Sequence, residues 1–261
     1  MNIQSIADRI VLVSLNLGCW RATKLNKRET RRERQRHGND TLRVTLRVCE
    51  HPALEELKKL HNSVYVEHKH ITLPSVMDGL RVLPMSKVEQ HQNVIQDAKS
   101  EHDRLVSEFL RDYPQERINA KDRLGSLYEP QAWPDPSLMS SKFSFVCRHL
   151  RCPTDGQWAE WLQETVEVAH AELRERLVGA ARHLVEVCRD GKLFQSAFDN
   201  LKEIATLVGD GFNLLDDPIV AFAAKQLAEQ ADKDAFVVRL DDKERKRVAQ
   251  NIESILDGFT L

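Results

Sequence analysis

The chain has 261 residues, of which 41% are hydrophobic and 30% charged, and its formal net charge is −2. This composition is that of a folded globular protein; it excludes a disordered chain, and the overall charge does not point to nucleic acid or a membrane surface. Only 10 glycines and 9 prolines are present, which argues against the many turns of a β-sandwich or barrel and predicts long helices.

The apolar segments and the cysteines bear on the cellular compartment of the protein. No segment approaches the roughly 18–20 consecutive apolar residues of a membrane span, and the apolar stretch 10–20 is interrupted by Asn16. The five cysteines are odd in number and none forms a C-x-x-C pair: Cys19, Cys49, Cys147, Cys152 and Cys188. A disulfide framework or zinc ribbon is therefore not expected, and we predict a cytoplasmic protein with no membrane contact.

The first elements predicted along the chain differ in character. Residues 10–20 indicate a buried strand or a short core helix. Residues 21–40 are basic and solvated, as in an exposed helix or a mobile arm. Residues 42–48 alternate between apolar and polar side chains, which indicates a strand or the start of the next helix. That helix is expected from about Pro52 to about His68, because proline fits the first helical turn.

The middle of the chain predicts its longest amphipathic helix. Asp78-Gly79 is a turn or hairpin signal, and Ser86 with Glu89 forms a capping-box pattern at a helix start. The predicted helix covers about 86–113 and ends or kinks at Pro114. Apolar residues and histidines recur along one side of it, at spacings of three and four, which favours packing on another helix: Val88, His91, Ile95, Ala98, His102, Leu105 and Phe109.

Helices dominate the rest of the chain. A strand is expected from Phe143, and a capping pattern at Thr154 and Gln157 opens a long helix that ends at Gly191. One face of this helix is predicted to be apolar: Trp158, Leu162, Val166, Ala169, Leu173, Leu177, Ala180, Leu184 and Val187. Further helices are predicted over 193–208, after Asp217-Pro218 and from Asp241 onward. Acidic pairs at these last two positions are interpreted as helix caps, not as catalytic carboxylates.

These elements predict a mainly α fold: long antiparallel amphipathic helices with a small accessory β-sheet made from the strands near residues 12, 45 and 145. Residues 1–150 would form an N-terminal region that contains both helix and strand, with the basic segment 21–36 and the helix of about 86–113. Residues 151–261 would form a C-terminal helical region, packed as one domain with the first.

Several motifs carry a resemblance to a known family. They are the apolar segment ending in Trp20 and Lys24, the ITLP…DGLRVLP block from Ile71 to Pro84, the helix end Phe109 to Pro114, Leu124 to Tyr128, Trp133-Pro134, and Lys142 to Phe145. Together they resemble an uncharacterised family of helical proteins of bacteriophages and integrative elements, similar to DUF3150-type proteins. The resemblance implies a mobile-element origin, a bacterial host cell, and an assembly with an AAA+ ATPase or a von Willebrand A-domain protein. It implies no active site.

The basic segment is the clearest candidate for a binding surface. It holds Arg21, Lys24, Lys27, Arg28, Arg31, Arg32, Arg34 and Arg36. Such a cluster can bind nucleic-acid phosphates without sequence preference, with Trp20 stacking on a base, or it can bind an acidic protein. The alternative is a solvated helix face on which Glu29 and Glu33 pair with the arginines.

Reactive side chains do not form a motif that we interpret as an active site, a metal site or a cofactor site. His61 and His68 stand two helical turns apart, which is too far for one ion. His91 and His102 are expected to be core or interface histidines. Arg148 would lie on the opposite strand face from Cys147, so the thiol lacks an activating cation. No Gly-Lys-Ser/Thr motif exists, and no cofactor is expected.

We therefore predict a non-enzymatic interaction or adaptor protein that acts as a subunit of a larger assembly. Its partner would be a second copy of the chain, an AAA+ ATPase or a von Willebrand A-domain protein. The predicted partner interface consists of Ile95, Leu105, Phe109, Trp158 and Trp161. The alternative function is a nucleic-acid-binding accessory factor that uses segment 21–36.

Overall fold

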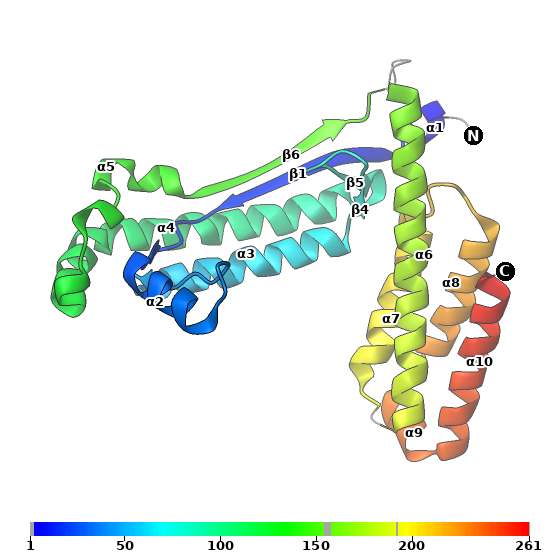
Figure 1. The fold of residues 1–261 in the computed structure, drawn as a ribbon. Helices are drawn as coiled ribbons and strands as arrows, with labels where there is room; N and C mark the ends of the chain where they lie inside the picture. The colour runs from blue at the N-terminus through cyan, green and yellow to red at the C-terminus, as the bar shows by residue number, and fades with distance from the viewer. Residues whose placement is uncertain (1–2, 154–157, 192, 261) are drawn as a thin grey trace. The chain divides into compact units, whose positions relative to one another are not determined.

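The fold is mainly helical, as a computed structural model covering residues 3–153, 158–191 and 193–260 shows (Figure 1). The helices are α1 (Ile3–Ala7), α2 (Lys27–His37), α3 (Pro52–His70), α4 (Val88–Leu124), α5 (Pro136–Met139), α6 (Ala159–Asp190), α7 (Gln195–Leu207), α8 (Pro218–Ala231), α9 (Ala235–Leu240) and α10 (Asp242–Thr260). The strands are β1 (Ile10–Gly18), β2 (Thr23–Leu25), β3 (Thr45–Arg47), β4 (Leu73–Pro74), β5 (Arg81–Pro84) and β6 (Ser144–Arg151). Within these described ranges, no helix is long and apolar enough to cross a membrane.

The chain divides into two compact units, and the division differs from the predicted boundary at residue 150. Unit 1 contains Met1–Ser14, His68–His91 and Arg148–Leu261, and unit 2 contains Leu15–Glu67 and Gln92–Cys147. Four continuous elements, β1, β6, α3 and α4, therefore pass from one unit to the other. Each unit is made of discontinuous segments, whereas the predicted regions 1–150 and 151–261 were continuous.

Unit 1 is built on a bundle of four helices. Helices α6, α7, α8 and α10 lie side by side (Figure 1), and their apolar faces meet in one core. The apolar stripe predicted for α6 supplies Leu162, Val166, Leu173, Leu177 and Leu184 to this core, and all five are buried. Burial of such a continuous stripe is the main stabilising term for a helix bundle.

The helix ends in unit 1 follow from local chemistry, as predicted. Gly191 ends α6 in the left-handed conformation with φ of 68°. The Asp217 carboxylate accepts hydrogen bonds from the backbone N–H groups of Ile219 and Val220 at the start of α8. Asp241 caps α10 in the same way, so these carboxylates act as helix caps. The capping pattern predicted at Thr154 and Gln157 lies outside the described residues.

Unit 2 packs α3 against α4. Leu54 and Leu57 of α3 and Leu105, Phe109 and Tyr113 of α4 are all buried in a shared aromatic and aliphatic core. A smaller cluster joins Val64, Ala98 and Phe145 to Leu15 and Leu17 of β1. The helix stripe with spacings of three and four thus has its partner inside the chain.

The strands form two sheets instead of the single accessory sheet that the sequence predicts. The larger sheet has the order β4-β5-β1-β6, and β1 pairs antiparallel with β5 so that Leu12 faces Val82. The strand predicted near residue 45 is β3, which pairs instead with β2 in a separate two-stranded sheet. The hairpin signal at Asp78-Gly79 is confirmed, because the chain turns between β4 and β5 with Gly79 at φ of 77°.

Two expectations about the ends of α4 differ from the structure. Pro114 does not end the helix; it lies inside α4, which continues to Leu124. Proline removes one helical hydrogen bond, but the following turns are held by buried Ala120 and by Arg123, which donates to the Val48 carbonyl at 2.9 Å. At the other end, the Ser86 hydroxyl does not cap α4; it donates to the Asp210 carbonyl.

Candidate functional site

Most of the basic segment forms the helix α2, not a mobile arm. The Asn26 side chain caps α2 by accepting a hydrogen bond from the Glu29 N–H, and Gly38 ends the helix in the left-handed conformation. Thr30 is the buried residue of this helix, and its hydroxyl accepts a hydrogen bond from the Val44 N–H at 3.0 Å. Val44 directly precedes β3, which pairs antiparallel with β2, so this hydrogen bond ties α2 to the start of the two-stranded sheet.

Most of the basic side chains lie on the face of α2 opposite Thr30. At 100° per residue, Arg28, Arg31 and Arg32 fall on one side of the helix, with Gln35 and Arg36 continuing that side. All five are exposed, whereas Thr30 is buried. The sequence pattern therefore places a stripe of guanidinium groups toward solvent; we call Arg28, Arg31, Arg32 and Arg36 the basic face.

Ion pairing within α2 neutralises this face only weakly. The Arg32 Nη1 lies 3.8 Å from Glu29 Oε2, and the Arg36 Nη1 lies 3.8 Å from Glu33 Oε1. The two arginine side chains remain 76% and 72% exposed. Exposed pairs of this kind contribute about 0–1 kcal/mol. Among the residues that the structure describes, Arg28 and Arg31 have no carboxylate within salt-bridge distance, and neither do Arg21 and Lys27. The glutamates thus leave the face available to an anion.

Two of the predicted binding residues have structural roles instead. The Arg34 Nε donates to the Leu42 carbonyl at 2.9 Å, which fastens the loop after α2 back onto the helix. The Lys24 Nζ donates to the Leu127 carbonyl at 2.8 Å and forms an ion pair with Glu129 at 2.9 Å. Since Lys24 is only 14% exposed, its charge is already used inside unit 2.

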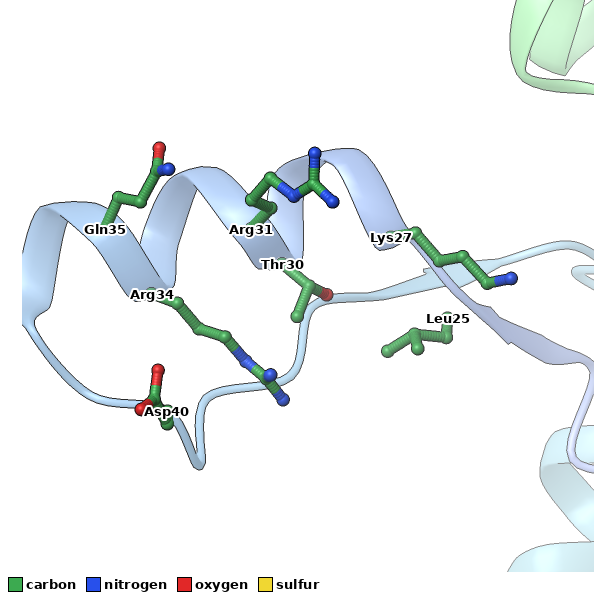
Figure 2. A pocket seen from close by; sticks show the side chains of 7 residues that line it. All are labelled: Leu25, Lys27, Thr30, Arg31, Arg34, Gln35 and Asp40. Carbon is green, nitrogen blue, oxygen red and sulfur yellow. The ribbon is translucent and has the colours of Figure 1, made fainter.

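An open hollow of about 440 Å³ lies beside α2 (Figure 2). It is lined by Leu25, Lys27, Thr30, Arg31, Arg34, Gln35 and Asp40. Figure 2 shows that the side chains do not converge on one point: Arg34 points toward the loop that carries Asp40, and Arg31 points away from that loop. A surface of this shape suits an extended anion better than a small enclosed ligand.

Trp20 packs among the aromatic rings of unit 2. Its ring lies 5.6 Å from Trp133, 5.9 Å from Tyr113 and 6.0 Å from Phe109, centroid to centroid. These rings meet edge-on or tilted, as aromatic side chains do in protein cores. Trp20 therefore belongs to the core of unit 2.

The predicted partner interface is also largely internal. Leu105 and Phe109 are fully buried in unit 2, and Ile95 packs against the smaller cluster of that unit. Trp158 and Trp161 are half-buried and meet edge-on at 5.6 Å, with Trp161 packed against the bundle core. Leu105 and Phe109 are thus not available to a partner, because other parts of the same chain cover them.

Several exposed apolar side chains lie on the C-terminal helices of unit 1. Phe222 on α8 is 66% exposed and Phe236 on α9 is 68% exposed. A groove of about 250 Å³ between α8 and α10 is lined by Ile219, Phe222, Ala223, Gln226, Ser254, Ile255, Gly258 and Phe259. We call this the α8/α10 groove; its residues were not among those the sequence singled out, since helical periodicity does not show which apolar positions stay uncovered.

Histidines from three elements meet in unit 1. His91 Nε2 lies 3.0 Å from His68 Nδ1, and His91 Nδ1 lies 3.0 Å from His149 Nε2. Burial lowers the pKa of His68 to about 3 and that of His91 to about 4, in each case helped by the neighbouring histidine charge. Burial also lowers the pKa of His149. The three rings are therefore neutral near pH 7.

Cys147 lies beside these histidines. The sequence did not predict this grouping. Cys147 and His149 are two residues apart on β6 and share its inner face, with Arg148 exposed on the other. The Cys147 Sγ, a ring nitrogen of His91 and one of His149 all lie within 4.8 Å of one another. The signal was the i, i+2 spacing of a cysteine and a histidine in a predicted strand; only the fold supplies His91.

Comparison with known proteins adds no further assignment. No protein-family model matches the chain, and no curated protein or solved structure matches it either. The resemblance to phage and integrative-element proteins therefore stays a prediction.

Proposed function

We propose that the chain is a binding protein and that the basic face of α2 is its contact surface for the phosphate backbone of nucleic acid. The observation that carries the proposal is the orientation of α2, with Thr30 facing the sheet and the arginines facing solvent. Guanidinium groups donate paired hydrogen bonds that match phosphate oxygens. The absence of converging side chains in the neighbouring hollow favours an extended polyanion.

Binding of this kind has a defined salt dependence. Each phosphate neutralised on duplex DNA contributes a slope of about −0.9 to the plot of log affinity against log salt concentration. Four contacts from the basic face predict a roughly 100-fold weakening between 50 and 200 mM salt. Sequence preference is not expected, because phosphate contacts do not read bases.

Replacing Arg28, Arg31 and Arg32 by glutamine tests the proposal. Glutamine has nearly the same helix propensity as arginine, so α2 should persist while three positive charges are lost. We expect duplex binding at 50 mM salt, measured by fluorescence anisotropy, to weaken at least tenfold. The salt slope should become less steep by about 2.7.

A matched control separates local contact from overall charge. Lys243, Lys246 and Arg247 on α10 are exposed, and their replacement by glutamine removes the same charge from another helix. We expect this control variant to bind as the unaltered chain does. Equal loss in both triple variants, or no binding by the unaltered chain at low salt, contradicts the proposal.

A second candidate function, the adaptor role, is supported by the α8/α10 groove. Ile219 and Phe222 are 56% and 66% exposed at its edge, and exposed aromatic side chains beside an apolar groove are typical of protein interfaces. The partner proposed here is an apolar helix of a second copy of the chain. The AAA+ ATPase or von Willebrand A-domain protein implied by the resemblance is the other candidate partner.

Sedimentation tests the self-association. We expect the apparent mass to rise with protein concentration, and we expect Ile219→Ser with Phe222→Ser to abolish this rise. Phe194→Ser is the control, because Phe194 is also 64% exposed in unit 1 but does not line the groove. A chain that stays monomeric at all concentrations and captures neither candidate protein would rule out the adaptor role through this groove.

A further inference from the structure

We infer that His91, His149 and Cys147 form a site for a zinc-type divalent cation, with His68 positioning the His91 ring. The inference is independent of the proposed binding function. It stands on donor chemistry and geometry: two imidazole nitrogens and one thiol sulfur lie within 4.8 Å of one another on α4 and β6. Imidazole and thiolate are the donors that Zn²⁺ prefers in proteins.

The distances fit one ion. Ligands at about 2.0–2.1 Å from tetrahedral zinc place their two nitrogens roughly 3.3 Å apart. The His91 Nδ1 and His149 Nε2 atoms are 3.0 Å apart, so a small rotation of either ring makes room for the cation between them. The Cys147 Sγ lies on the same face of β6 as His149. Three protein donors leave the fourth tetrahedral position to a water molecule or a bound ligand.

His68 supplies the second layer that metal-binding histidines usually have. A histidine that ligates through one nitrogen normally donates its other N–H to an acceptor, which fixes the tautomer and the ring orientation. The His91 Nε2 lies 3.0 Å from His68 Nδ1, so His91 can donate there while its Nδ1 lone pair faces His149. His68 and His91 are 4% and 0% exposed, so this arrangement is held inside the fold.

The donor groups bind a cation in defined protonation states. Histidine ligates zinc through a neutral ring nitrogen, and cysteine ligates it as the thiolate. Cation binding at this site therefore displaces one proton from the Cys147 sulfur.

Cobalt(II) is the probe for this site. The purified full-length chain, stripped of metal, is titrated with Co²⁺ and followed by visible and near-ultraviolet absorption. We expect one equivalent to give the intense visible bands of tetrahedral cobalt and a sulfur-to-cobalt charge-transfer band, and we expect one equivalent of Zn²⁺ to remove both. A chain that gives neither band overturns the inference.

Variants assign the donors. Cys147→Ser should eliminate the charge-transfer band, and His149→Gln should weaken cobalt binding, whereas Cys152→Ser and His170→Gln should leave the titration unchanged. His68→Leu should retain the charge-transfer band but weaken the affinity 10- to 100-fold, as expected of a positioning residue. Circular dichroism of each variant verifies its fold, and a charge-transfer band that persists in Cys147→Ser overturns the assignment.

Discussion

Phe109→Ala is expected to destabilise unit 2 by about 3–5 kcal/mol, the usual cost of deleting a fully buried phenylalanine ring. Phe109 is 0% exposed. Its ring centroid lies 5.3 Å from that of His51, 5.5 Å from that of Tyr113 and 5.6 Å from that of Phe143. These neighbours come from three separate segments of the chain, so they cannot all move inward to fill the space left by the ring.

Tryptophan fluorescence provides a local measurement of this effect. Trp20 lies in the same cluster as Phe109, whereas Trp158 and Trp161 lie in unit 1. Replacing Trp158 and Trp161 by phenylalanine leaves Trp20 and Trp133 as the remaining tryptophans. Their fluorescence during urea unfolding then reports on unit 2. Phe222→Ala, at a 66% exposed position, should change stability by less than about 0.5 kcal/mol. A similarly small change for Phe109→Ala would show that this cluster is not a packed core.

Mild acid is expected to destabilise unit 2 through His61. The ring of His61 stacks on that of His102 at 5.3 Å, and the Nε2 atoms of both rings are buried without a hydrogen-bond partner among the described residues. Burial, followed by the charge of His102, lowers the pKa of His61 from 6.5 to about 4. The unfolded chain therefore binds a proton at a higher pH than the folded chain does.

The sign of the effect follows from this difference. Above pH 6.5 both states are neutral at His61 and the full stability is present. As the pH falls from about 6.5 toward 4, the unfolded state gains a proton that the folded state excludes, and stability is lost. At about 1.4 kcal/mol per pKa unit, the loss by pH 4.5 is roughly 2.5 kcal/mol.

Urea unfolding between pH 7 and 4.5 measures this dependence. His61→Gln should reduce the pH dependence by about one proton, because glutamine does not titrate. The exposed His183→Gln is the control and should leave the pH dependence unchanged. Carboxylates contribute mainly below about pH 4.5, so they lie outside this window. If His61→Gln and the unaltered chain lose stability in parallel, the assignment to His61 is incorrect.

Local patterns were sufficient to predict much of the helical fold. The apolar stripe of α6, the glycine that ends it and the aspartate caps of α8 and α10 are confirmed. Each depends on residues within one or two turns, where side-chain spacing and backbone hydrogen bonding decide the outcome. The sequence also showed the positive charge of segment 21–36. It did not show which of its basic side chains are already bonded within the chain.

Pairings distant in sequence were decided by the tertiary structure. Pro114 remains inside α4 because core contacts hold the turns on either side of it, and β3 pairs with β2 because the two strands flank α2. The same holds for the candidate sites: Lys24 is occupied by Glu129, and His91 meets His149 across 58 residues. The sequence by itself determined most of the long helices and where the basic charge lies. Only the tertiary structure decided which faces are covered and which reactive groups meet, because those contacts depend on the packing of segments far apart in the chain.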